Sequence, residues 1–204
     1  MFGDGDFWGF RNLFKIGNFD KRMEKKKYQN KFILIGVLAG LVAILDFIGI
    51  IVFPVGIVGA SGFYIGFAFY AAFAIWFRWR GLLAIYIGLL IGALISGTFT
   101  IFAFILALGN VIGASVPMFV FSIKKFNPEL KSTKDYVAYI LSSTILQNIL
   151  AAVWILTGFY LVGIMPKGAI IVASSGWVIG DVIVSIIIGI PLLKFLTPII
   201  KKHQ

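Results

Sequence analysis

The sequence predicts an all-α membrane protein, a bundle of six transmembrane helices with both termini cytoplasmic, from its composition and the spacing of its apolar stretches. Hydrophobic residues make up 60% of the chain and charged residues only 13%, with a mean hydropathy of +1.02. Six apolar stretches each approach the ~20 residues that cross a bilayer core. They are Phe32–Phe53, Val55–Phe77, Gly81–Thr100, Phe102–Ile123, Tyr136–Gly163 and Gly168–Leu193.

The positions of the basic residues agree with six spans, because this topology places all but one of the 18 Lys and Arg residues on the same side of the membrane. These residues precede the first span or follow the second, fourth and sixth spans, and only Lys167 lies opposite. Lys and Arg in short loops are retained in the cytoplasm. Both termini are therefore predicted to be cytoplasmic, in a multi-pass protein of the cell membrane.

The remaining segments predict one membrane domain, residues 32–193, between a cytoplasmic N-terminal segment, 1–31, and a basic cytoplasmic tail, 194–204. The formal net charge of +10 would suggest nucleic acid in a soluble protein. Here the sidedness of the spans accounts for it, so the expected partner is the lipid bilayer, with its anionic lipids, and no nucleic acid.

The N-terminal segment predicts a short amphipathic helix on the inner membrane surface, followed by a basic run. Phe7, Phe10 and Phe14 recur at helical spacing, while Arg11 and Lys15 fall on other faces. Such a helix serves either as a topology anchor or as a docking site for a cytoplasmic partner.

Several chemistries do not fit the residue inventory. The chain has no cysteine, and its single histidine, His203, follows the last span, so no cofactor is expected. The run Gly59–Gly62 matches the Gly-x-Ser-Gly of intramembrane serine proteases, but no histidine within a span can activate Ser61. Ser61 is therefore interpreted as a packing residue, and no enzyme is predicted.

The candidate ligand-binding residues are the polar side chains and one tryptophan that the spans carry between their outer third and the midplane. A carboxylate at the bilayer centre costs at least ~2.5 kcal/mol on insertion scales. No Lys or Arg lies within a span to neutralise these acids. Either they meet a ligand or a proton in a polar pocket, or each is a neutral acid bonded to its neighbours. The candidates are Asp46, Asn110, Gln147, Asn148, Trp177 and Asp181.

Helical periodicity predicts that these residues converge on one pocket that opens outward. Ser174, Trp177, Asp181 and Ser185 follow one face of the sixth span, which predicts that Asp181 points into the bundle. The rival interpretation is that each polar group is satisfied locally between two helices. The candidate residues include two acids and three amides, and no Lys or Arg lies within a span. This combination argues against an anionic ligand.

Small residues recur at four-residue spacing, which allows helix backbones to approach closely in lipid. This pattern fits ordinary packing within the bundle, and it also fits a dedicated face for a partner. The pairs are Gly36 and Gly40, Ala39 and Ala43, Gly62 and Gly66, and Gly88 and Gly92.

A series of short motifs resembles the membrane-associated sensor domains of the MASE type. That resemblance implies a helical membrane fold that senses a ligand and signals to an effector such as a cyclase or kinase. This chain ends soon after the sixth span, so the signal is expected to pass to a separate protein. The motifs are Phe53–Ile57, Arg80–Leu83, Ala107–Asn110, Lys134–Val137 and Trp177–Asp181, running to Pro191–Leu192.

A second resemblance is to the substrate-binding membrane subunits of energy-coupling-factor transporters, which are also stand-alone six-helix chains with short loops. Ala39-x-x-x-Ala43 resembles the motif by which those subunits dock onto a coupling module. The expected functions are thus a small-ligand-binding sensor that signals through a partner, a substrate-binding subunit of an uptake transporter, or an accessory subunit of a larger membrane complex.

Overall fold

The computed structural model describes residues 6–52, 64–163 and 177–202, with side chains described from residue 29 onward. Within these ranges every regular element is helical, which confirms the all-α prediction. The chain divides into two compact units, Met1–Val37 and Leu38–Gln204.

The first unit is the beginning of helix α1 (Asp6–Val52), which continues without a break into the second unit. Helix α1 is longer than the short N-terminal helix that the sequence predicts, because it runs on past Gly17 and Asn18. The run from Lys21 to Gln29 consists mostly of residues with high helix propensity, which favours continuity. The predicted amphipathic face belongs to side chains outside the described ones.

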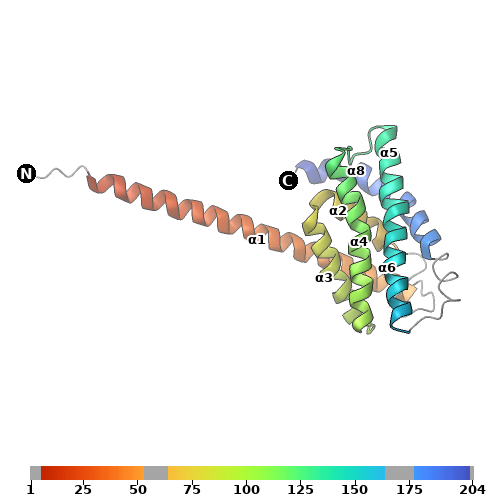
Figure 1. Cartoon of the computed structure of the whole chain (residues 1–204). Coiled ribbons are helices and arrows are strands. Elements are labelled where there is room, and N and C mark those ends of the chain that lie inside the picture. Colours follow the sequence, from red (N-terminus) through yellow and green to blue (C-terminus); the bar gives the residue numbers. More distant parts are fainter. Residues whose placement is uncertain (1–5, 53–63, 164–176, 203–204) are drawn as a thin grey trace, which may run out of the picture. The chain divides into compact units, whose positions relative to one another are not determined.

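The second unit, from Leu38 onward, contains the remaining helices (Figure 1). After the end of α1 come α2 (Gly66–Phe77), α3 (Trp79–Ile95) and α4 (Ile101–Ile123). Thr133–Leu161 is one continuous helix made of α5 (Thr133–Tyr139), the π-helical η1 (Ile140–Leu146) and α6 (Gln147–Leu161). Trp177–Lys202 is likewise continuous and includes the π-helical η2 (Ser185–Gly189) and α8 (Ile190–Lys202).

Four described helices are long and apolar enough to cross a membrane: Gln29–Val52, Ile101–Ile123, Thr133–Leu161 and Trp177–Lys202. Helices α2 and α3 are shorter, with 12 and 17 residues. The predicted second and sixth spans, and the outward-facing Lys167, lie partly or wholly outside the described residues. The count of six spans and the cytoplasmic termini therefore stay predictions.

Three predicted boundaries are corrected. Helix α3 ends at Ile95 and not at Thr100, because Gly97 adopts φ 71°, the left-handed conformation that commonly ends a helix. The fifth predicted span begins earlier, at Thr133, where Ser132 and Asp135 form a capping box. The last helix continues past Leu193 into the predicted tail and ends at Lys202.

Glycines bring the helices of the second unit into close contact. A Cβ on Gly88 of α3 would lie 2.5 Å from the Cβ of Val42 and 2.6 Å from the carbonyl oxygen of Ala39. Similarly, a Cβ on Gly113 of α4 would lie 2.6 Å from the carbonyl oxygen of Gln147. The small-residue spacing at Gly88 and Gly92 thus serves packing within the bundle, between α3 and α1.

Helices α2 and α3 form a tight hairpin. Arg78 is the single residue between them and adopts φ 54°, an uncommon value for a residue other than glycine. A Cβ on Gly81 would collide with the backbone carbonyl of Phe73, so the two helices touch directly at their joined ends.

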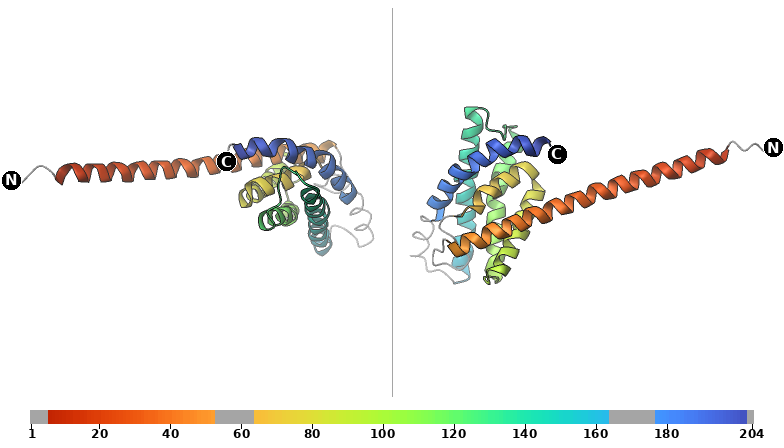
Figure 2. Two further views of the ribbon diagram at one scale, coloured as in Figure 1. Left: turned by 90° about the horizontal axis from the view of Figure 1, so that it is seen from above. Right: turned by 180° about the vertical axis from the view of Figure 1, so that it is seen from behind.

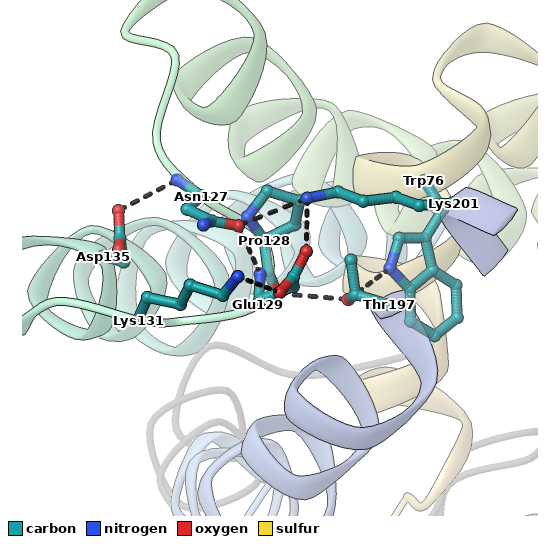
Figure 3. Close-up of polar contacts among 8 residues, drawn as sticks. All are labelled: Trp76, Asn127, Pro128, Glu129, Lys131, Asp135, Thr197 and Lys201. Atoms are coloured by element: carbon teal, nitrogen blue, oxygen red, sulfur yellow. Dashed lines mark hydrogen bonds and ion pairs between the residues drawn. The ribbon is translucent and has the colours of Figure 1, made fainter. Parts of the chain in front are cut away.

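Polar side chains tie three segments together at one end of the second unit (Figure 3). Trp76 of α2 donates its indole N–H to the hydroxyl of Thr197 at 2.9 Å, and that hydroxyl donates to the carbonyl of Pro128 at 3.1 Å. Glu129 accepts from Lys131 and Lys201, each at 2.7 Å. We call these five side chains, with the carbonyl of Pro128, the loop–tail cluster. Figure 2 shows the last helix beside α2, which agrees with the contacts between them.

The first prediction concerns the glycine contact between α1 and α3. Gly88→Ala is expected to lower the free energy of unfolding by about 1–3 kcal/mol, because the added methyl group meets Val42 and the Ala39 backbone. Gly40→Ala is the matched control, since nothing lies within 4 Å of its Cβ position. It should be neutral or stabilise α1 by up to about 1 kcal/mol. Unfolding in mixed micelles measures both, and equal effects would contradict the assigned contact.

The second prediction concerns the pH dependence of the loop–tail cluster. Hydrogen bonds from Lys131 and then Lys201 lower the pKa of Glu129 below its ordinary value of 4.5. Because the pKa is depressed in the folded state, the stabilisation is present above pH 4.5 and is lost as the pH falls below it.

Hydrogen exchange of the Leu130 amide, which bonds the Asn127 carbonyl at 2.9 Å, reports on this loop. Protection should decrease below pH 4.5 in the wild type, after correction for the intrinsic exchange rate. Glu129→Gln should reduce that pH dependence, with the remainder due to the Asp135 carboxyl that accepts from Asn127 and Ser132 in the same loop, whereas Lys202→Gln should keep it in full. Identical pH profiles for Glu129→Gln and the wild type would contradict the assignment.

Candidate polar cavity

Asp46 lies where α1 meets α3, and its position depends on a glycine. A Cβ at Gly92 would lie 2.8 Å from the Cβ of Asp46, so only glycine leaves room for this side chain. The carboxyl oxygen Oδ1 of Asp46 accepts a hydrogen bond from the hydroxyl of Tyr64 at 2.7 Å. The Tyr64 hydroxyl is in turn hydrogen-bonded to the hydroxyl of Tyr70 on α2. All three side chains are buried.

A small cavity lies beside this hydrogen-bonded chain. Its volume of about 40 Å³ is enough for a few water molecules, since one water needs roughly 10–15 Å³ by the same measure. It is far below the roughly 300–1,000 Å³ of sites for drug-sized ligands. The lining residues are Asp46, Ile50, Tyr64, Leu89, Ala93, Thr98, Ala103, Leu106, Asn110 and Trp177.

Asn110 brings an amide to the cavity wall. Its Nδ2 donates to the carbonyl of Leu106, one turn earlier in α4, at 3.0 Å. That bond uses one of the two N–H groups on Nδ2, so the amide can still offer its second N–H to an acceptor and its carbonyl oxygen to a donor or a cation. The hydroxyl of Thr98, in the turn between α3 and α4, is a further oxygen on the same wall.

Asp181 is completely buried, as its position on the polar stripe predicts. The Trp177 side chain and the backbone N–H of Tyr64 lie close to its carboxyl, and Tyr70 is close enough to interact electrostatically with both Asp46 and Asp181. Among the described residues, however, neither carboxyl oxygen of Asp181 makes a hydrogen bond of ordinary geometry. The tyrosine pair is thus hydrogen-bonded to Asp46 through Tyr64, and Tyr70 also interacts electrostatically with Asp181.

Gln147 and Asn148 are also buried, where η1 passes into α6. Asn148 donates weakly from Nδ2 to the carbonyls of Thr144 and Val178, each at 3.5 Å. Neither amide atom of Gln147 has a hydrogen-bond partner among the described residues.

The structure thus brings part of the predicted set together. Asp46, Asn110 and Trp177 line the cavity, and Asp181 adjoins it through Trp177 and the tyrosines. Gln147 and Asn148 lie within the bundle but are not part of the cavity lining. Ligand binding by all six residues stays a prediction.

Sequence reasoning missed Tyr64, Tyr70 and Thr98. A signal for the two tyrosines was present, because a hydroxyl in an apolar span needs a polar partner when it is buried. Their order along the chain did not reveal that the partner is Asp46, 18 residues away from Tyr64.

The cavity offers oxygen atoms of three kinds, from a carboxyl group, an amide and hydroxyl groups, and no Lys or Arg is among its lining residues. Such a set suits water, a proton or a hard monovalent cation. The described residues contain no group of three acidic, histidine or cysteine side chains arranged to hold a metal ion. Comparison of the chain with family models, curated proteins and solved structures found no match.

The third prediction uses the different surroundings of two buried acids. Asp181→Leu is expected to be neutral or to stabilise the fold by up to about 2 kcal/mol, because it removes a buried polar group without hydrogen bonds. Asp135→Leu should instead destabilise by about 2 kcal/mol or more, since Asp135 accepts three bonds of 2.8–2.9 Å from Asn127 and Ser132.

Unfolding in mixed micelles compares the two variants. A clear loss of stability in Asp181→Leu would mean that the Asp181 carboxyl has a bonding partner in the membrane-embedded protein.

Proposed function

We propose that this chain is an integral membrane module that binds a small cation or a proton in its polar cavity and reports occupancy to a separate protein partner. Binding of a small ligand with signalling through a separate partner is what the resemblance to MASE-type sensor domains implies, and the cation or proton is our inference from the cavity. The observation that carries the proposal is the Asp46 carboxyl, held by the Tyr64 hydroxyl on the wall of a cavity of about 40 Å³.

Electrostatics favours a positively charged ligand. An uncompensated carboxylate in the membrane interior is costly, and Asp46 is buried with no Lys or Arg among the residues that line the cavity. A proton or cation neutralises the negative charge without enlarging the cavity. The hydroxyls of Tyr64 and Thr98 and the amide of Asn110 supply further oxygen ligands.

The cavity size supports sensing of a small ligand over vitamin uptake. A volume of about 40 Å³ is too small for a vitamin-sized molecule. Ala39 and Ala43, which resemble a docking motif of uptake subunits, are each only 2% exposed and so are not displayed on the surface of the second unit. The accessory-subunit alternative keeps one observation in its favour, because nothing lies within 4 Å of the Cβ position of Gly40.

Helix α2 offers a route from the cavity to a partner. It carries Tyr70 in the hydrogen-bonded chain and Trp76 in the loop–tail cluster. Moving Tyr70 would therefore disturb the bond between Trp76 and Thr197, and with it the basic surface around Lys201.

The proposal includes six spans with cytoplasmic termini. Three basic segments that the charge sorting assigns to the cytoplasm adjoin one another, since contacts join the end of α2, the loop before α5 and α8. An effector, a coupling module or a larger complex would meet the chain at this end.

The fourth prediction tests cation binding directly. The purified chain in detergent should unfold at a higher temperature as Na⁺, Li⁺ or protons are added at constant ionic strength. At 100 times the dissociation constant, the expected stabilisation is about 2.7 kcal/mol. Asp46→Asn should lose this dependence, because it removes the charge and keeps the shape and the hydrogen-bond acceptor.

Glu129→Gln is the matched control, since it removes the same type of charge from an ion pair in the loop–tail cluster, away from the cavity. It should respond to added Na⁺ or Li⁺ like the wild type. The proposal fails if the wild type responds to no small cation and to no change of pH, or if Asp46→Asn responds equally.

A further inference from the structure

A second, larger hollow lies outside the polar cavity and shares no lining residue with it. It is a groove of about 480 Å³ where α5 and η1 meet α4 and the loop that follows α4. Its walls are almost entirely apolar except at one end. The lining residues are Val120, Phe126, Thr133, Lys134, Val137, Ala138, Leu141, Ser142 and Leu146.

The groove follows one face of a helix that is long and apolar enough to cross the membrane. Lys134, Val137 and Leu141 lie at i, i+3 and i+7, the spacing of a single helix face. Val137 is 48% exposed and Leu141 is 51% exposed, whereas Ala138 and Ser142 are buried and form the floor. In a bilayer, such an exposed apolar face meets lipid chains.

The length of the groove matches one leaflet. From Lys134 to Leu146 the helix rises on the order of 18 Å, at about 1.5 Å per residue. Half of a typical hydrocarbon core is roughly 15 Å. An acyl chain that starts at the level of Lys134 would therefore extend along the groove to about the middle of the bilayer.

The charged end of the groove is basic and not neutralised. Lys134 has no ion-pair partner in the described part of the chain. The nearby acid Glu129 is paired with Lys131 and Lys201, and the carboxyl of Asp135 is occupied by hydrogen bonds from Asn127 and Ser132. Thr133, the residue before Lys134, also lines this end and can supply a hydroxyl donor.

We propose that this groove binds one anionic phospholipid, with its phosphate at Lys134 and Thr133 and one acyl chain along Val137, Leu141 and Leu146. The basic end of the groove matches the phosphate of such a lipid, and the apolar remainder, about as long as one leaflet, matches its acyl chain. This site is independent of the polar cavity and of any ligand there.

The fifth prediction tests both parts of the site by native mass spectrometry of the full chain, released from micelles containing phosphatidylglycerol or phosphatidylcholine. The wild type should retain one phosphatidylglycerol in preference to phosphatidylcholine. Lys134→Gln should weaken this retention about fivefold, the effect expected for one basic residue near a membrane surface. Lys202→Gln, a charge loss at the end of α8 and outside the groove, should retain the lipid normally.

The apolar part is tested by filling the groove. Val137→Trp keeps Lys134 but occupies the trough, so it should abolish retention of the specific lipid. Val153→Trp is the matched control, an exposed valine on the same continuous helix that does not line the groove.

Three results would overturn the proposal: equal retention of both lipids by the wild type, unchanged retention in Val137→Trp, or unchanged retention in Lys134→Gln. Glycerol phosphate, the headgroup without chains, should not compete with the lipid. Effective competition by it would indicate a simple anion site and would also overturn the proposal.

Discussion

The interior of the second unit depends on how closely α1 approaches α3. At Gly88 the backbones are separated by less than the space that a methyl group needs, and at Gly92 the freed space is filled by the Asp46 side chain. A larger residue at either position would push α1 outward. The carboxyl would then move away from the Tyr64 hydroxyl, which is its hydrogen-bond donor. The contact between α1 and α3 and the position of the Asp46 carboxyl therefore depend on the same two glycines, Gly88 and Gly92.

The apolar stretches were sufficient to predict the fold class, because hydrocarbon allows few alternatives to a helix when every backbone group must be bonded internally. Helix ends were less predictable. The end of α3 follows from the conformation of Gly97, and the start of α5 follows from the hydrogen bonds between Ser132 and Asp135. Both features depend on local backbone geometry in the loops, which the apolar pattern does not specify. The extension of the last helix to Lys202 depends in part on Thr197 and Lys201 bonding to a loop about 70 residues earlier.

The candidate site was predictable to the extent that depth and periodicity specify it. Helical faces predicted that Asp181 points inward, and the shared depth of Asp46, Asn110 and Trp177 anticipated their common cavity. Periodicity within one helix does not determine how neighbouring helices are rotated against each other. For that reason Gln147 and Asn148 were grouped with a cavity that they do not line, and the tyrosine pair bonded to Asp46 was overlooked.

The tight hairpin at Arg78 restricts how the cavity can change shape. With a single residue between α2 and α3, and with Gly81 against the Phe73 backbone, these two helices have no hinge of their own. We therefore expect Tyr70 on one helix and Leu89 and Ala93 on the other to move together. Widening the cavity requires α1, α4 or the last helix to shift against this body. Trp76 belongs to the same hairpin and is linked through Thr197 to the loop before α5, so a movement of the hairpin is expected to reach that loop.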